Sequence, residues 1–254
     1  MSATAPERVT AAALIIGDEI LSGRTADVNL NAIANFLTGH GVDLAEARFV
    51  CDSARDIVEA VNALRSRYDY VITTGGIGPT HDDITADCVA EAFNLPLVED
   101  PQIIADMTAR FSEPPNEARR RMARIPEGGS KVKNALGGPP GFQIDNVFVL
   151  AGIPRVMQSM LQDVGPRLRG GAVMLSRTLK VEAAGEGLIA GPLGATAIAR
   201  PDLIFGSYPF QNEKGYGANL VVRGRDPAAL ETGVEALLEA LARAGIEGAT
   251  REPD

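Results

Sequence analysis

The segment from Val71 to Thr85 combines glycines and carboxylates in a pattern that could bind a phosphorylated ligand. It reads VITTGGIGPTHDDIT, so a short apolar run ends in a glycine-rich loop and a helical pattern follows. Glycines let backbone N–H groups approach an anion closely, and a helix N-terminus adds positive partial charge. Asp82 and Asp83 would repel such an anion unless a cation lay between them. The segment therefore predicts a phosphate site with a divalent metal ion, most simply Mg²⁺.

The same segment also fits a structural role. Thr80 could be the N-cap of the following helix, and Asp83 could close a capping box, which would explain both residue types without a ligand. A capping pair leaves room for a ligand site, so the two interpretations are compatible. We favour the site because further carboxylates follow the neighbouring predicted strands.

These further carboxylates come after two other strand patterns. Asp18 and Glu19 follow the apolar run 11–16 after Gly17, and Asp52 follows the loosely alternating stretch 42–50. Together with the glycine loop, three consecutive links would meet at the carboxyl edge of a parallel sheet, where ligands of open α/β sheets bind. Gathered carboxylates could bind Mg²⁺ and orient water for attack on a pyrophosphate. For Glu19 and Asp82, a role as solvated surface acids stays open.

Alternating strand and helix patterns set the fold class. Helical spacing of apolar residues at 29–40, 53–68 and 84–93 separates the strand patterns. The order βαβαβα predicts an α/β fold with a mostly parallel sheet covered by helices on both faces. Farther along, we expect broken helix over 96–131 and a hairpin over 142–150.

A change of composition at Arg169-Gly170-Gly171 marks a predicted domain boundary. Residues 8–172 are expected to form the α/β ligand domain. Beyond the boundary, patterns in the order βαββα predict a small α+β domain over 176–254. One continuous sheet through both segments would contradict this division.

The overall composition excludes some function classes. The 254 residues carry a net charge of −9 and 45% are apolar, so the chain can bury a sizeable core but offers no nucleic-acid face. The densest basic cluster, Arg119–Arg121, is interpreted as a solvated helix face. Cys51 and Cys88 are expected to be buried, reduced thiols. The apolar run 11–16 is too short for a signal sequence or a membrane span, so we expect a soluble cytoplasmic protein.

Several segments together resemble a known family. They are GDEIL at 17–21 with DVN at 27–29, Asp52, TTGGIGPTHDDIT at 73–85, NALGGPPGF at 134–142 and LAGIP at 150–154. This combination is similar to the molybdopterin-binding domain, in particular to the N-terminal domain of the competence/damage-inducible protein CinA. The same domain opens eukaryotic-type FAD synthases, and two later segments resemble the region after this domain in those enzymes: EGLIA at 186–190 and FGSYP at 205–209. The resemblance implies a three-layer α/β sandwich with a mostly parallel sheet.

The resemblance also implies roles for individual residues. Asp52 and Asp83 match the two aspartates that matter for chemistry near the pterin phosphate in related adenylyltransferases, so both are catalytic candidates. The residues expected to hold the metal are Asp18, Glu19, Asp82 and Asp83. The expected ligand-binding residues come from the glycine loop, a second loop and the turn after the last parallel strand: Thr74, Gly75, Gly76, Gly78, Pro79, Asn134, Gly137, Gly152 and Pro154. Relatives usually have Leu-Pro-Gly-x-Pro at this turn, whereas LAGIP lacks one proline and keeps the glycine.

The residues and the resemblance imply a metal-dependent enzyme that acts on a phosphorylated pterin or nucleotide. Its most concrete form is hydrolysis of a pyrophosphate in a substrate of the FAD or ADP-ribose class. Two alternatives stay open: a factor in molybdenum-cofactor biosynthesis that binds or adenylylates molybdopterin, and a non-catalytic ligand-binding protein. A backbone cradle recognises phosphate rather than the base, so the sequence does not choose among these ligands. We expect a homo-oligomer with a small phosphorylated ligand, and neither nucleic acid nor membrane as a partner.

Overall fold

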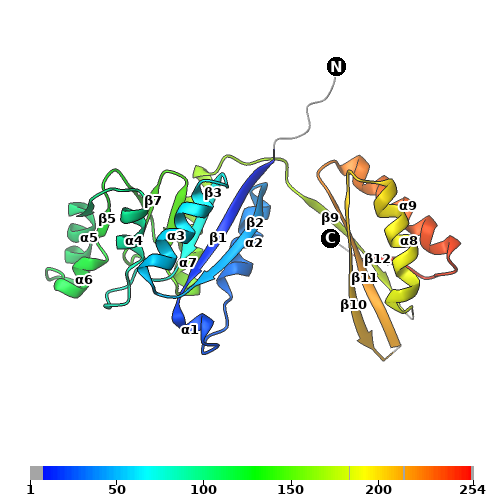
Figure 1. Ribbon diagram of the computed structural model, residues 1–254, viewed down its shortest axis with the longest axis horizontal. Coiled ribbons are helices and arrows are strands. Elements are labelled where there is room, and N and C mark those ends of the chain that lie inside the picture. Colours follow the sequence, from blue (N-terminus) through cyan, green and yellow to red (C-terminus); the bar gives the residue numbers. More distant parts are fainter. Residues whose placement is uncertain (1–7, 183, 214, 253–254) are drawn as a thin grey trace, which may run out of the picture. The chain divides into compact units, whose positions relative to one another are not determined.

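The chain folds into two compact units, which are coloured along the sequence in Figure 1. The computed structural model describes residues 8–252 except 183 and 214. The division falls between Gly171 and Ala172. We call the two parts the N-terminal unit (8–171) and the C-terminal unit (172–252). Each of the two larger sheets lies within one unit.

Four parallel strands form the centre of the N-terminal sheet. In spatial order they are β2 (Val42–Val50), β1 (Val9–Ile16), β3 (Tyr70–Thr74) and β8 (Val147–Leu150). Residues 11–14 and 147–150 are fully buried, because both faces of the sheet are covered. Consecutive apolar residues are typical of such strands. The predicted α/β class with a mostly parallel sheet is confirmed.

Two short antiparallel strands extend this sheet beyond β8. β7 (Gly141–Ile144) joins β8 through a tight hairpin, and β6 (Ser130–Val132) pairs with β7. Asp145 takes up the left-handed conformation at the hairpin, with φ 50°. An aspartate tolerates this conformation better than most residues do. The hairpin expected over 142–150 is confirmed.

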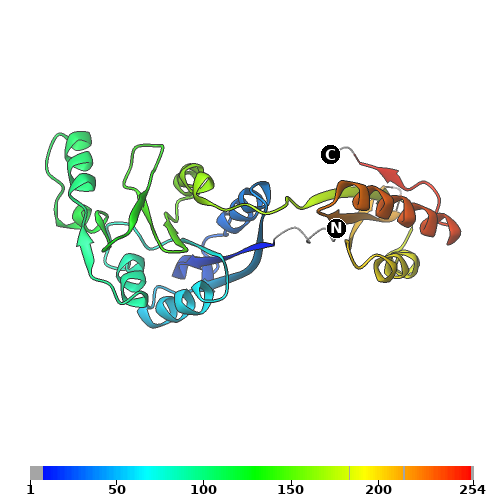
Figure 2. The ribbon, with the colours of Figure 1, turned by 90° about the horizontal axis from the view of Figure 1, so that it is seen from above.

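Four helices complete the three layers (Figure 2). They are α2 (Asn29–Gly39), α3 (Ala54–Arg65), α4 (Thr85–Ala92) and α7 (Pro154–Val164). The helices α3 and α4 share one core with Leu14 of β1, whereas α2 and α7 share the other with Ile15. Successive side chains of β1 thus enter opposite cores, which fixes the register of the central strand. Two shorter elements are α1 (Asp18–Leu21) and the 3₁₀ turn η1 (Gly165–Arg167).

The segment 96–131 contains more strand than its sequence predicts. Helices α5 (Pro101–Phe111) and α6 (Glu117–Arg121) account for its helical pattern. The flanking strands β4 (Leu97–Glu99) and β5 (Arg124–Pro126) pair into a separate two-stranded sheet. Strands of three residues are too short to show a period of two, so the expectation of broken helix alone was wrong here.

The C-terminal unit is a four-stranded antiparallel sheet with helices on one face. Its elements in chain order are β9 (Leu175–Val181), α8 (Glu186–Ala199), β10 (Ile204–Asn212), β11 (Gly215–Gly224), α9 (Pro227–Arg243) and β12 (Thr250–Arg251). The strand order is β10-β11-β9-β12. Ile189, Leu220 and Leu237 belong to the core between sheet and helices. The order βαββα agrees with the sequence pattern, and β12 is an additional strand.

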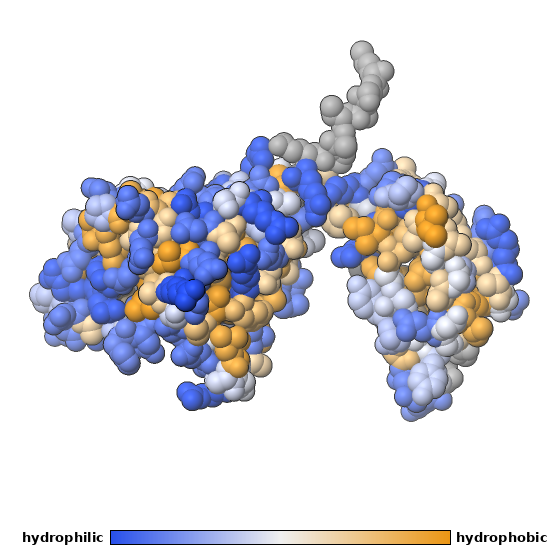
Figure 3. All heavy atoms as spheres, viewed as in Figure 1, coloured by the Kyte–Doolittle hydropathy of each residue, from blue (hydrophilic) through white to orange (hydrophobic). Residues whose placement is uncertain are grey.

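Helix α8 carries apolar side chains outside this core as well. Leu188 is 68% exposed and Ile198 is 84% exposed. Figure 3 shows pale and orange surface over this helix. None of the helices in the described residues has the length and hydrophobicity needed to cross a lipid bilayer.

Both cysteines are free thiols, as expected. Cys88 is buried, and burial raises its pKa to about 11. Cys51 is half-buried rather than buried, and its Sγ donates to Oδ2 of Asp56 at 3.1 Å. This hydrogen bond is the main reason why the pKa of Cys51 is raised.

Candidate functional site

A cavity of about 560 Å³ lies at the carboxyl ends of the parallel strands. Residues that lie just after β1, β2, β3 and β8 line it, as expected for the position of ligands in open α/β sheets. The predicted site residues that line this cavity are Glu19, Asp52, Gly75, Gly76, Gly78, Pro79, Asp82, Asp83, Asn134 and Gly152. Those outside its lining are Asp18, Thr74, Gly137 and Pro154.

Four backbone N–H groups at this cavity have no acceptor in the part of the chain that the structure describes. They belong to Gly76 and Ile77 in the glycine loop and to Gly152 and Ile153 after β8. Other donors of the glycine loop are occupied, since Gly75 N donates to the Leu150 carbonyl at 3.2 Å. Unpaired backbone donors from two loops are suited to bind an anion such as phosphate.

The two loops approach each other closely at their glycines. A Cβ atom added to Gly152 would lie 3.3 Å from Cα of Gly75. Gly75 has φ 110° and Gly76 has φ 65°, conformations that side chains disfavour. Glycine at these positions thus permits both the turn of the loop and the close contact.

Asn29, a buried residue that we did not predict from the sequence to belong to the site, connects these loops. Nδ2 of Asn29 donates to Thr74 Oγ1 at 3.0 Å and to the Gly152 carbonyl at 2.7 Å. Thr74 Oγ1 in turn donates to the Ala151 carbonyl at 2.8 Å. Thr74 therefore connects β3 to the turn after β8 and does not line the cavity. In the sequence, the indication of a role for Asn29 is that it belongs to the DVN segment at 27–29.

Asp52 lies among other carboxylates at the edge of the cavity. The backbone N–H of Asp18 donates to Asp52 Oδ2 at 2.9 Å, and the Asp52 N–H donates to Asp18 Oδ1 at 3.4 Å. Burial raises the pKa of Asp52 above its usual value, and the negative charges of Asp18, Glu19 and Asp82 raise it further. The side chain thus experiences negative charge that a bound cation would neutralise.

This donor set has the right chemistry for a hard divalent cation. Within the described residues, however, no three histidine, cysteine or acidic side chains are arranged to hold a metal ion by themselves. Mg²⁺ commonly binds through one or two carboxylates and completes its coordination with water and substrate phosphates. The residues therefore fit a metal ion that binds together with a phosphorylated ligand.

Asp83 organises the glycine loop. Its Oδ1 accepts from Gly78 N at 2.7 Å, and its Oδ2 accepts from Thr80 N at 2.8 Å and from Thr80 Oγ1. Helix α4 begins at Thr85 with Ile84 at the N-cap, so the expected capping box with Thr80 as N-cap is wrong in position. The Asp83 carboxylate instead closes a turn that begins at Thr80, five residues before the start of α4.

We expect Asp83→Asn to lower the free energy of unfolding by about 1–3 kcal/mol, because an amide group would face donors that now bond to a carboxylate. Turnover should fall as well, since the displaced loop carries two of the unpaired N–H groups. Urea unfolding of Asp83→Asn and of the exposed neighbour Asp82→Asn measures the effect. Equal stability of the two variants would contradict the assigned role.

Arg121 lies behind the glycine loop rather than in solvent. It is half-buried, and its Nη2 donates to the Asp83 carbonyl at 3.3 Å. Its Nε is buried with no hydrogen-bond partner among the described residues. The interpretation of Arg119–Arg121 as a solvated helix face is therefore wrong for Arg121. Three consecutive arginines give no periodic signal that would single out the buried one.

Asn134 fixes the second predicted ligand loop. Its Oδ1 accepts from Leu136 N at 3.0 Å and from Ser159 Oγ at 2.9 Å, and its Nδ2 donates to the Pro139 carbonyl at 3.4 Å. Asn134 is buried, so it shapes the loop from inside. Gly137, at the tip of this loop, has φ 77° and accepts a hydrogen bond from Arg110.

Comparison with known proteins gives two family matches. The model described as the probable molybdopterin binding domain matches residues 12–170, which include every residue that lines the cavity. The model described as the middle domain of FAD synthase matches residues 173–249, most of the C-terminal unit.

Individual relatives agree with these matches. A CinA-like protein of Myxococcus xanthus is 33% identical over 76% of this chain and 49% of its own length. A protein of Thermococcus kodakarensis is 35% identical over 88% of this chain and 94% of its own length. The crystal structure of the protein CinA from Thermoplasma acidophilum superposes with a TM-score of 0.60 at 30% identity, over 63% of this chain and 98% of that one. The chain thus spans about half of the CinA-like protein and nearly all of the Thermococcus protein, and it belongs to the molybdopterin-binding domain family.

Proposed function

We propose that the cavity binds a phosphorylated pterin or nucleotide, and that the protein hydrolyses a pyrophosphate of the FAD or ADP-ribose class with a divalent metal ion. One observation carries this proposal: the unpaired N–H groups of Gly76, Ile77, Gly152 and Ile153 share a cavity with Asp52. Donors for the anionic phosphate and a carboxylate that can accept a proton from water are two components of a site for hydrolysis of a phosphate anhydride.

The surroundings of the cavity favour a ligand with both phosphate and ring. Helix α7 begins at Pro154 with Ile153 as its N-cap, so the positive end of the helix dipole lies at the cavity. Met122, Val156 and Met160 line the same space. Apolar side chains of this kind suit the flat ring of a pterin or a nucleobase.

Asp52 is the residue to which we assign the proton transfer. A divalent metal ion, when bound, supplies positive charge to phosphate oxygens and lowers the pKa of a bound water molecule. One or two of the carboxylates of Asp18, Glu19 and Asp82 would hold it, because both carboxylate oxygens of Asp83 already accept hydrogen bonds within the glycine loop. Asp52 Oδ2 accepts from Asp18 N, whereas Oδ1 has no partner among the described residues. Oδ1 can therefore take the proton of the attacking water.

The test is a turnover assay on the full chain with FAD or ADP-ribose, in Mg²⁺ and in EDTA. Water should add across the anhydride, giving FMN and AMP from FAD, or AMP and ribose 5-phosphate from ADP-ribose, in Mg²⁺ alone. Chromatography of the products with calorimetry of binding separates the outcomes. Binding without products would replace the hydrolase by a ligand-binding protein. Tight binding of molybdopterin with no turnover of either nucleotide would favour molybdenum-cofactor biosynthesis instead.

A further inference from the structure

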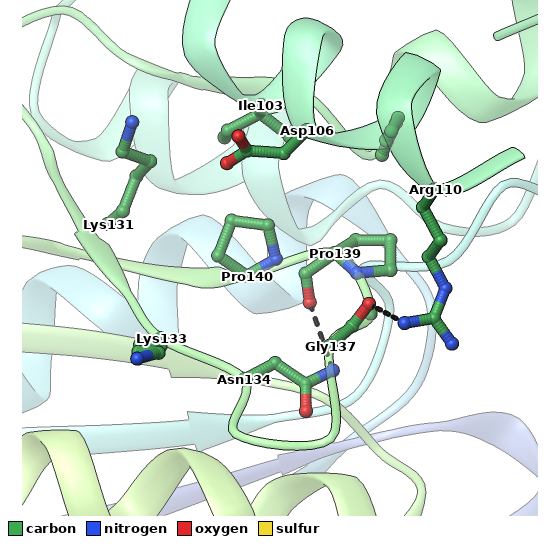
Figure 4. Close-up of a pocket in the computed structure, with 11 residues that line it drawn as sticks. Ile103, Asp106, Arg110, Lys131, Lys133, Asn134, Gly137, Pro139 and Pro140 are labelled. Atoms are coloured by element: carbon green, nitrogen blue, oxygen red, sulfur yellow. Dashed lines mark hydrogen bonds between the residues drawn. The ribbon is translucent and has the colours of Figure 1, made fainter. Parts of the chain in front are cut away.

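A second cavity, of about 460 Å³, adjoins the first one. Asn134, Gly138 and Pro139 line both cavities, so the loop between β6 and β7 separates them. The remaining walls come from α5 and from the end of β6 (Figure 4). The function proposed above makes no use of this space.

The charges that line this second cavity are mostly positive. Lys131, Lys133 and Arg110 line it, and Asp106 is the acidic residue among the described lining residues. The chain has four lysines in 254 residues and a net charge of −9, yet two of the four lysines line this cavity. A local excess of positive charge in an acidic protein is typical of a site for an anion.

The cationic groups are positioned from two sides. Lys131 lies on β6 and Lys133 two residues later, whereas Val132 between them is buried in the opposite core. Side chains two residues apart on an extended chain share a face. Figure 4 shows both lysines on one side of the cavity and Arg110, from α5, on the other.

Within the described residues, these cationic groups are only partly paired with acceptors. Lys131 Nζ lies 3.4 Å from Asp100 Oδ1, a long ion pair, and Arg110 donates to the Gly137 carbonyl. The ammonium group of Lys133 has no ion pair or hydrogen bond with any residue that the structure describes. Asp106 accepts from Gln102 Nε2 at 2.8 Å. An anion in the cavity would therefore meet two ammonium groups and one carboxylate that already has a partner.

Apolar side chains contribute much of the remaining lining. Ile103 and Met107 of α5 are buried, and Pro139 and Pro140 lie across from them. A methionine adapts its shape to a flat group, and proline rings offer a rigid apolar surface. The cavity thus combines a surface for a ring or sugar with cations for its charged substituent.

We propose that this second cavity binds a terminal phosphate at the far end of the ligand, beyond the part held in the first cavity. The substrate class is then a nucleotide or pterin pyrophosphate that carries an additional phosphate monoester. Lysine ammonium groups bind phosphate as compact point charges, and the loop shared by the cavities lets one ligand contact both. The identity of the ligand rests on the proposed function, but the anion site itself does not.

The experiment compares two ligands that differ by one phosphate, ADP-ribose and ADP-ribose 2′-phosphate. Calorimetry in EDTA should show that the wild-type chain binds the phosphorylated ligand at least about tenfold more tightly, as a charge-assisted contact implies. Lys133→Ala and Lys131→Ala should each reduce this difference and leave the affinity for ADP-ribose unchanged. Lys180→Ala, the same substitution in β9 of the C-terminal unit, is the matched control.

Failure of this inference is distinguishable from failure of the proposed function. If both ligands bind equally to the wild-type chain, or the difference survives in both lysine variants, the second site is overturned. If neither nucleotide binds in EDTA or in Mg²⁺, the proposed ligand class is wrong, and inorganic phosphate then tests the anion site. Broadening of its ³¹P resonance that the Lys131→Ala/Lys133→Ala variant removes would support the site, whereas broadening that persists would overturn it.

Discussion

Asp52→Asn is expected to reduce turnover of ADP-ribose by about 10²–10⁴-fold, the usual contribution of a general base. The asparagine keeps the size of the side chain, and its carbonyl oxygen can still accept from Asp18 N, which now lies 2.9 Å from Asp52 Oδ2. It cannot take a proton from water at neutral pH. Steady-state kinetics in Mg²⁺ give the effect, with binding of ADP-ribose measured in parallel.

The matched control is Asp145→Asn at the hairpin between β7 and β8. Asp145 is exposed and has φ 50°, a conformation that asparagine tolerates equally well. It lies before β8, whereas the cavity lies after that strand. Turnover should be unchanged in this variant. A rate for Asp52→Asn within a few-fold of wild type would remove Asp52 from the chemistry.

The raised pKa of Asp52 also predicts how the stability of the metal-free protein depends on pH. The native state favours the protonated form, so the stabilising contribution of Asp52 is present below the pKa of the unfolded chain. This contribution is lost as the pH rises through the folded value. In EDTA at neutral pH, urea unfolding should therefore show Asp52→Asn to be at least as stable as wild type.

The sequence allowed the centre of the fold to be predicted because its signals are local. The run 11–16 has six consecutive apolar residues, which are typical of a strand covered on both faces. The helical spacing of apolar residues over 53–68 is also a local signal, and it predicts helix α3. The strands β4, β5 and β6 could not be predicted, because their three residues each are defined by their pairing partners and carry no pattern of their own.

The residues of the candidate site could likewise be predicted only where the sequence signal is local. Asp52 and Gly152 could be placed because they follow predicted strands, and the ends of parallel strands meet at one edge. Asn29 and Arg121 act through contacts with segments more than 30 residues away, which no local pattern encodes. The position of Asp83 in the sequence suggested a role in metal binding and catalysis. In the folded loop its carboxylate is directed toward Gly78 and Thr80, and the sequence alone does not show this direction.

Gly76→Val is expected to weaken binding of pterin phosphate, FAD and ADP-ribose alike, each by at least about tenfold. Gly76 has φ 65°, where a β-branched residue is strained. A Cβ atom there would also lie 2.2 Å from Thr85 Oγ1. That hydroxyl is buried and donates to the Gly75 carbonyl at 2.9 Å, so its displacement would detach the loop from the start of α4.

Gly128→Val separates the two causes of this effect. Gly128 has φ 81°, and a Cβ atom added there would meet no atom within 4 Å. The control variant therefore shares the backbone strain, which costs on the order of 1–3 kcal/mol, but not the collision at the site. It should lose stability and keep its affinity for all three ligands.

Calorimetry on the folded Gly76→Val variant decides where the phosphate binds. The three ligands share a phosphate group and differ in their ring systems, so a loop that binds phosphate must affect them equally. An equal loss with all three supports the phosphate on the N–H groups of Gly76 and Ile77. A loss confined to one ligand would instead place Gly76 against the ring system of that ligand, and the phosphate would then belong to the turn at Gly152 and Ile153.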